Sequence, residues 1–117
     1  MNEEQYLFSL ESRGIKLGLQ RTIQLLKDCG SPHKEIQIIQ IIGTNGKGST
    51  SAILSQLLQA DFSVGLYTSP HLLSFQERIR VNGASIKIKE VQRFLKKYKN
   101  AIEKTKASFF EVMTVMA

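Results

Sequence analysis

The order of apolar and polar residues predicts short helices in the first thirty positions and a longer one near the end of the chain. Residues 3–14 and 19–30 each end in a glycine, the residue typical of a helix C-terminus. Ser31 and Pro32 then interrupt the chain. Residues 90–106 predict a helix whose apolar positions form one stripe among lysines. These positions are Val91, Phe94, Leu95, Tyr98 and Ile102.

The middle of the chain predicts a strand, a helix and a second strand. Residues 36–42, "IQIIQII", are rich in β-branched side chains and bounded by glycine, which indicates a strand buried on both faces of a parallel sheet. A helix is expected from Ser49, and residues 63–68, "SVGLYT", indicate the next strand. The fold class predicted is therefore α/β, with a right-handed βαβ unit in a mostly parallel sheet. The helix is expected to pack through Ala52, Ile53, Leu57, Leu58 and Ala60.

The remainder predicts a loop over residues 68–83, closed by an Asn82-Gly83 turn, and a final helix. Ser108 and Glu111 have the spacing of a capping box, in which each residue accepts a backbone hydrogen bond from the other. The apolar face of this helix has few remaining elements to pack against, and two parallel strands make a poor sheet. We therefore expect residues 1–117 to be the front part of a longer protein.

A glycine-rich segment, "IIGTNGKGSTSAIL", joins the predicted strand to the predicted helix. Backbone amides at the start of a helix attract anions, and glycines let phosphate oxygens approach the backbone closely. Lys47 would neutralise outer phosphates, and the hydroxyl of Ser49 or Thr50 would bind Mg²⁺. The spacing departs from the usual phosphate-binding loop, because two residues separate Gly43 from Gly46-Lys47 and Gly48 follows the lysine. The alternative is a tight turn that carries a surface lysine.

Composition narrows the picture further. The chain has 117 residues, enough for one domain, and a net charge of +6. Eight of its sixteen Lys and Arg residues lie between Lys87 and Lys106, which favours a solvated helix face, with a phosphate-rich partner as the alternative. No apolar run is long enough to cross a membrane, and the start does not resemble a signal peptide. Cys29 is the only cysteine, so a cytoplasmic location is expected.

Three separated segments resemble the folylpolyglutamate synthase/dihydrofolate synthase family, relatives of the Mur peptide ligases. They are "GTNGKGS", "GLYTSPHLLSFQERIRVNG" and "SFFEVMT". The segment "LGLQR" at residues 17–21 is also similar to the family's "LGLER", with Gln20 where glutamate is more usual. Mur ligases share the short "GTNGK" loop but lack the "TSPHL…ERIRVNG" segment, which favours the folate branch. The resemblance covers almost the whole chain and implies the N-terminal part of the ATP-binding domain of a larger ligase.

The resemblance also implies roles for single residues. The ATP phosphates would be wrapped by Gly43, Thr44, Asn45, Gly46, Lys47, Gly48 and Ser49. Lys47 would be the catalytic cation, and Ser49 and Ser69 would hold Mg²⁺. On the residues alone, the favoured role of Ser69 is that of a turn hydroxyl that caps its own loop before Pro70.

The substrate would contact the start of the final helix. The candidates are Ser108, Phe109, Phe110, Glu111 and the loop residue His71. Phe110 could stack on a flat aromatic substrate. Each candidate also has an alternative role. Phe110 could be a core aromatic at a helix start, Glu111 could only close the capping box, and His71 could be solvated or hydrogen-bonded locally.

The implied reaction joins L-glutamate to dihydropteroate or folate with ATP and Mg²⁺, through an acyl phosphate. The family supplies further metal ligands and a C-terminal domain from beyond residue 117, so we expect this chain alone to be inactive or nearly so. The full-length protein is expected to be a monomer with no nucleic-acid or membrane partner. A non-catalytic nucleotide-binding module and a Mur-type peptide ligase fragment remain the alternatives.

Overall fold

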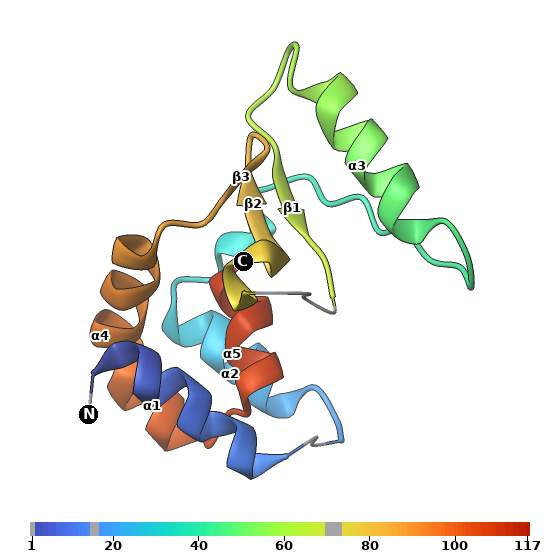
Figure 1. Ribbon diagram of the computed structural model, residues 1–117. Coiled ribbons are helices and arrows are strands. Elements are labelled where there is room, and N and C mark those ends of the chain that lie inside the picture. The colour runs from blue at the N-terminus through green and yellow to red at the C-terminus, as the bar shows by residue number, and fades with distance from the viewer. Residues whose placement is uncertain (1, 15–16, 70–73) are drawn as a thin grey trace. The chain divides into compact units, whose positions relative to one another are not determined.

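The computed structural model describes residues 2–14, 17–69 and 74–117. The chain folds into two compact units, one made of residues 1–37 and 89–116 and the other mainly of residues 38–88. The first unit contains the helices at both ends of the sequence, and the second contains the glycine-rich loop, an α-helix, a short 3₁₀ helix and a small sheet (Figure 1).

The first unit is helical and has four α-helices and two 3₁₀ helices in its described part. In chain order they are α1 (Glu3–Ser9), η1 (Leu10–Arg13), α2 (Gln20–Asp28), η2 (Pro32–Lys34), α4 (Ile88–Thr105) and α5 (Phe109–Met116). The glycine stops are confirmed: Gly14 and Gly30 follow these helices with φ of 69° and 88°. A left-handed conformation is one that glycine adopts without steric cost.

The core of this unit lies where α5 packs against α2 and α1. Its large, fully buried apolar side chains are Leu7, Leu10, Leu25, Val91, Leu95, Ile102, Val112 and Met113. The expected stripe on α4 is confirmed by Val91, Leu95 and Ile102, which are buried while the lysines of the helix are exposed. The expectation that α5 has little to pack against is wrong, because the two N-terminal helices return to cover its apolar face.

The second unit has a three-stranded antiparallel sheet in the order β1 (Gly65–Tyr67), β2 (Ile79–Val81), β3 (Ala84–Ser85), with the 3₁₀ helix η3 (Phe75–Arg78) before β2. The predicted strand near residue 65 is confirmed, but its partner is the returning chain rather than a parallel strand. Gly65 is opposite Val81 and Tyr67 is opposite Ile79. The segment expected as one loop thus contains η3 and a strand.

The Asn82-Gly83 turn is confirmed and joins β2 to β3. Asn82 and Gly83 have φ of 49° and 86°, the pair of positive angles that a tight hairpin turn of type I′ requires. The Asn82 side chain also accepts a hydrogen bond from the Val64 amide at 2.8 Å. This contact ties the turn to the residue before β1.

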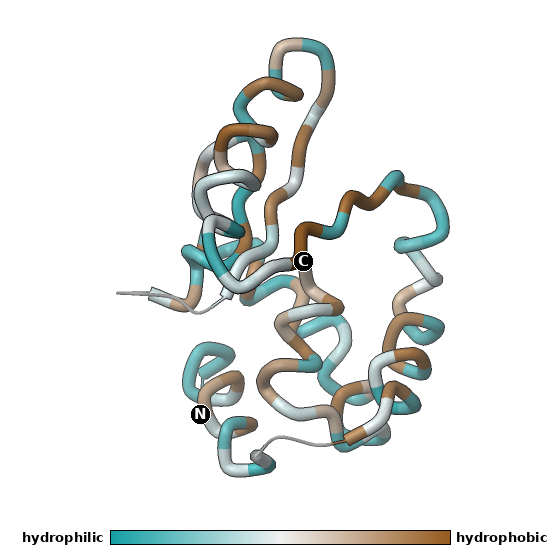
Figure 2. Tube along the Cα trace, turned by 90° about the vertical axis from the view of Figure 1, so that its right-hand side faces the viewer, coloured by the Kyte–Doolittle hydropathy of each residue, from teal (hydrophilic) through white to brown (hydrophobic). Residues whose placement is uncertain are grey.

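The buried strand predicted at residues 36–42 is absent from the structure. The segment has no regular secondary structure and is largely exposed, with Ile38 67% and Ile42 82% accessible. It is mostly hydrophobic, with Gln37 and Gln40 as its polar residues (Figure 2). A strand needs neighbours for its N–H and C=O groups, and no described strand pairs with it. The sequence pattern therefore shows what the segment prefers, not a pairing that it makes here.

The helix after the glycine loop is α3 (Lys47–Leu58), two residues earlier than expected. Its predicted packed face is also wrong: Ile53 and Leu57 are 61% and 69% exposed, and the one buried residue of α3 is Ser55. The described part of the second unit offers this helix only the small sheet, which it contacts through β1. No helix among the described residues is long and apolar enough to span a membrane.

Candidate functional site

The glycine-rich loop leads directly into the N-terminus of α3. Gly46 is the N-cap in a left-handed conformation, with φ of 76°, and Lys47 is the first helical residue. The Thr50 amide donates to the Gly46 carbonyl at 2.9 Å, which is the first turn of the helix. The loop thus has the predicted position, although the residues before it do not form a strand.

The backbone amides of this loop have no hydrogen-bond acceptor among the described residues. Within the part of the chain that the structure describes, no amide from Gly43 to Ser49 donates a hydrogen bond to a protein oxygen. Amides at a helix N-terminus carry a partial positive charge and suit an anion. A loop whose amides were already bonded to carbonyls would have ruled out this role.

Packing gives no reason for a glycine at position 48. A Cβ atom built on Gly48 or on Gly46 meets no other atom within 4 Å. At Gly43 the same test places a Cβ 3.8 Å from Lys47 Cγ, so the lysine stem lies beside Gly43. The glycines therefore leave open space over the backbone, next to a cation.

The hydroxyl groups near the loop divide into two kinds. Ser51 Oγ donates to the carbonyls of Lys47 and Gly48, at 2.6 and 3.2 Å, and is committed to the helix. Ser49 is exposed and makes no such bond within the described residues. Ser69 follows β1 and is also exposed, while His71 lies outside the described residues.

A metal ion would find few charged ligands in this part of the protein. The described residues contain no group of three or more His, Cys, Asp and Glu side chains that could hold a metal ion. The exposed hydroxyls of Ser49 and Ser69 are neutral ligands, whereas Mg²⁺ prefers carboxylates and phosphate oxygens. These serines fit a metal that is also held by phosphates, not a site made by the protein alone.

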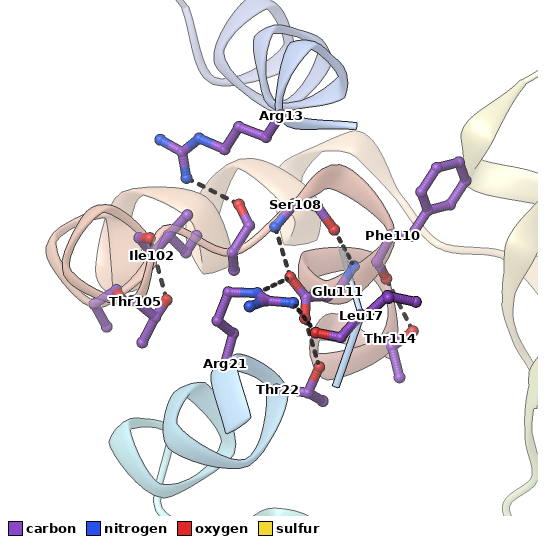
Figure 3. A network of polar contacts seen from close by, with 12 residues as sticks. Arg13, Leu17, Arg21, Thr22, Ile102, Thr105, Ser108, Phe110, Glu111 and Thr114 are labelled. Carbon is purple, nitrogen blue, oxygen red and sulfur yellow. Dashed lines mark hydrogen bonds and ion pairs between the residues drawn. The ribbon is translucent and has the colours of Figure 1, made fainter. Parts of the chain in front are cut away.

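The N-terminus of α5 is the second candidate region, and its capping box is confirmed. The Ser108 amide donates to Glu111 Oε1 at 3.0 Å, and the Glu111 amide donates to Ser108 Oγ at 3.3 Å. Arg21 Nε donates to the same Glu111 oxygen at 3.0 Å, and Thr22 Oγ1 lies 3.4 Å from the other (Figure 3). Glu111 thus connects α5 to the first turn of α2.

The charge on Glu111 is stabilised by these contacts. Burial by itself raises the pKa of Glu111, but the hydrogen bonds from Ser108 and the Arg21 guanidinium outweigh it and hold the pKa below its ordinary value. The alternative role considered for Glu111, closure of the capping box, is therefore present in the structure. Arg21 and Thr22 were not among the predicted site residues, although Arg21 ends the "LGLQR" segment that resembles the family.

The two phenylalanines at the start of α5 have different surroundings. Phe109 is 2% exposed and stacks on Phe8, with ring centroids 6.2 Å apart and planes at 14°. Phe110 is 43% exposed and forms a T-shaped contact with Phe109, with ring centroids 5.4 Å apart and planes at 85°. In Figure 3 the ring of Phe110 is directed away from the Glu111 network. Of these two candidates, Phe110 is the ring with surface accessible to a ligand.

Known proteins resemble this chain over most of its length. No family model matches it. A probable dihydrofolate synthetase of Schizosaccharomyces pombe is 45% identical over 109 residues, which cover 88% of this chain and 25% of that protein. The crystal structure of folylpolyglutamate synthase from Thermotoga maritima superposes with a TM-score of 0.86 at 38% identity, over 98% of this chain and 29% of that one. The chain belongs to the folylpolyglutamate/dihydrofolate synthase family.

A third similar protein has been crystallised with ligands bound. The crystal structure of a bifunctional folylpolyglutamate synthase/dihydrofolate synthase with Mn, AMPPNP and L-glutamate bound matches 100% of this chain, with a TM-score of 0.85 and 31% identity. This chain spans about a quarter of the length of the matching synthases of Schizosaccharomyces pombe and Bacillus subtilis. The family assignment therefore rests on one portion of those longer proteins.

Proposed function

We propose that this chain supplies the ATP-phosphate loop of a ligase that joins L-glutamate to dihydropteroate or a folate. The observation that carries the proposal is the set of loop amides from Gly43 to Ser49, which have no protein acceptor in the described structure and end at the N-terminus of α3. Family membership supports the choice of reaction, and the relative with bound AMPPNP supports a nucleotide ligand.

The residues of the loop fit a triphosphate. Main-chain amides and the partial charge of the helix N-terminus would bind phosphate oxygens, and the open space over Gly46 and Gly48 would let them approach. Lys47 would place its ammonium group on the outer phosphates. Thr44 and Asn45 complete the turn between the glycines. This is the arrangement that phosphoryl transfer needs, because such catalysis depends on positioning and charge neutralisation.

Ser49 and Ser69 would hold Mg²⁺ together with phosphate oxygens, and the metal would neutralise charge on the nucleotide when bound. Because no cluster of charged ligands is present among the described residues, the remaining ligands would come from elsewhere in the ligase. The choice of Mg²⁺ over other divalent cations is part of the proposal.

The reaction would take place in two steps. A carboxylate oxygen of the pteroate or folate substrate attacks the γ-phosphorus of ATP, the bond to the bridging oxygen breaks, and ADP leaves. The amine of L-glutamate then attacks the acyl phosphate, loses a proton and displaces inorganic phosphate to form the amide. The exposed ring of Phe110 would stack on the substrate, with Ser108, Phe109 and Glu111 supporting it; His71 is a further candidate contact.

The exposed segment 36–42 would take its place in a parallel sheet of the whole ligase. Its five isoleucines and the exposed Ile53 and Leu57 of α3 support this assignment. Residues 1–117 would then be the N-terminal part of the ATP-binding domain. A cytoplasmic, monomeric full-length enzyme remains our prediction.

Substitution of Lys47 tests the nucleotide site. We expect Lys47→Ala to weaken Mg-AMPPNP binding about 10- to 150-fold, since a hydrogen bond to a charged group contributes about 1.5–3 kcal/mol. The control for loss of one surface charge is Lys104→Ala on α4. Isothermal titration gives the affinities of the wild type, Lys47→Ala and Lys104→Ala. Equal affinity of Lys47→Ala and the wild type would refute the assignment of this loop.

A further inference from the structure

The Arg21 guanidinium connects two segments that are far apart in the sequence. Its Nη2 donates to the Leu17 carbonyl at 2.8 Å, and its Nε donates to Glu111 Oε1 at 3.0 Å (Figure 3). The first contact fixes the chain just before α2, and the second fixes the first turn of α5. One side chain therefore sets the distance between the "LGLQR" segment and the start of α5.

The ion pair between Arg21 and Glu111 is partly shielded from water. The side chains of Arg21 and Glu111 are 24% and 11% exposed, so water screens the pair less than it screens a surface pair. By comparison, Arg93 and Glu90 on α4 form a pair of equal length, 3.0 Å, with side chains 72% and 51% exposed. Loss of Arg21 would leave a mostly buried carboxylate without its cation, which costs more than loss of a surface pair.

Phe110 stands between two residues that are fixed. On one side the Phe109 ring is buried against Phe8, and on the other Glu111 is held by Arg21 and Ser108. The Phe110 carbonyl also accepts a hydrogen bond from Thr114 Oγ1 at 2.9 Å. The backbone that carries the exposed ring cannot shift unless one of these contacts breaks.

We propose that Arg21 is a positioning residue that, through the Glu111 carboxylate, fixes the ring of Phe110 for stacking on the flat aromatic part of the substrate. The proposal rests on the proposed function for the nature of the ligand, a pteridine joined to aminobenzoate. It adds a residue on α2 that touches no ligand itself. Its effect comes from the geometry of α5, because a ring that is displaced by about 1 Å loses much of its contribution to binding.

The position of the ring is measured first, without any ligand. 4-Fluorophenylalanine is incorporated at position 110, and the fluorine resonance is recorded in the wild type, Arg21→Met and the control Arg93→Met. We expect the resonance to shift or broaden in Arg21→Met and to stay unchanged in Arg93→Met. An unchanged resonance in Arg21→Met would overturn the proposal.

Binding of pteroate by the same proteins is measured next, by equilibrium dialysis. Arg21→Met is expected to bind about tenfold more weakly than the wild type, and Arg93→Met as tightly as the wild type. The single variant Glu111→Gln and the double variant Arg21→Met/Glu111→Gln are measured as well. The double variant should lose less than the sum of the two single losses, because both substitutions break the same ion pair. Thermal denaturation of each variant shows that the protein is folded at the temperature of the assay.

The outcomes separate this inference from the proposed function. If the wild type binds pteroate and Arg21→Met binds it equally well, the inference is wrong and the proposed function stands. If the wild type binds Mg-AMPPNP but no pteroate, the substrate pocket at Phe110 is wrong, and the ligand part of the inference falls with it. Losses that are additive in the double variant would show that Arg21 does not act through Glu111.

Discussion

Gly48 and Gly14 allow a paired test of the phosphate loop, because the same substitution has opposite effects on stability at the two positions. A Cβ atom meets no other atom within 4 Å at either glycine. Gly48 lies in the first turn of α3, where alanine is favoured over glycine by about 0.5–1 kcal/mol. Gly14 has φ of 69° and ψ of −160°, a conformation that costs a non-glycine residue about 1–3 kcal/mol.

We therefore expect Gly48→Ala to raise the melting temperature by about 2–4 °C and Gly14→Ala to lower it. Nucleotide affinity should follow a different order. The methyl group at position 48 would occupy the space through which phosphate oxygens approach the amides, and loss of one such charged hydrogen bond weakens binding about 10- to 150-fold. Gly14 lies in the first unit, where no nucleotide contact is proposed, so its substitution should leave affinity unchanged.

Circular dichroism during heating gives the stability of each variant, and isothermal titration with Mg-AMPPNP gives the affinity. The informative result is a more stable protein that binds nucleotide more weakly. If Gly48→Ala binds as tightly as the wild type, phosphate does not approach this part of the backbone, and the proposed use of the glycines is refuted. If Gly48→Ala is less stable, the helical conformation of position 48 is wrong.

Two further predictions concern acid and turnover. The pKa of Glu103 is lowered by the hydrogen bond from Tyr6 and by the nearby Arg13, and the pKa of Glu111 is lowered by its contacts with Ser108 and Arg21. The stability that each ionised carboxylate contributes should be complete above the ordinary glutamate pKa of about 4.3. It should be lost as the pH falls through the lowered pKa values. Urea denaturation at a series of acid pH values should show this fall, with a smaller slope in Glu111→Gln; equal slopes would contradict the role of Glu111. We expect the 117-residue chain to release ADP far more slowly than about 1 s⁻¹ when it is given ATP, L-glutamate and dihydropteroate or tetrahydrofolate. A coupled assay that found ordinary enzyme rates would show that no further part of the ligase is needed.

The features predicted correctly from the sequence depend on contacts between residues close together in the chain. Gly14 and Gly30 end helices because their backbone angles suit glycine, and Asn82-Gly83 forms its turn for the same reason. The capping box of Ser108 and Glu111 needs only a spacing of three residues. The stripe on α4 repeats at the period of a helix. Local geometry is sufficient for each of these predictions.

The incorrect predictions concern the pairing and packing of segments. "IQIIQII" has the composition of a buried strand, yet no described strand pairs with residues 36–42. The strand near residue 65 is present, but its antiparallel partner comes from a segment predicted as a loop. Composition cannot show which segment lies beside another, because any extended backbone can make the same ladder of hydrogen bonds.

The sequence by itself determined where most helices begin and end, where the turns lie, and that a glycine-rich loop with one lysine precedes a helix. Only the tertiary structure decided that the loop amides lack protein acceptors in the described part of the chain and that Arg21 pairs with Glu111, 90 positions away. The physical reason is the range of the interactions. Caps and turns are formed within a few residues, whereas an ion pair between two helices exists only after their apolar faces have packed together.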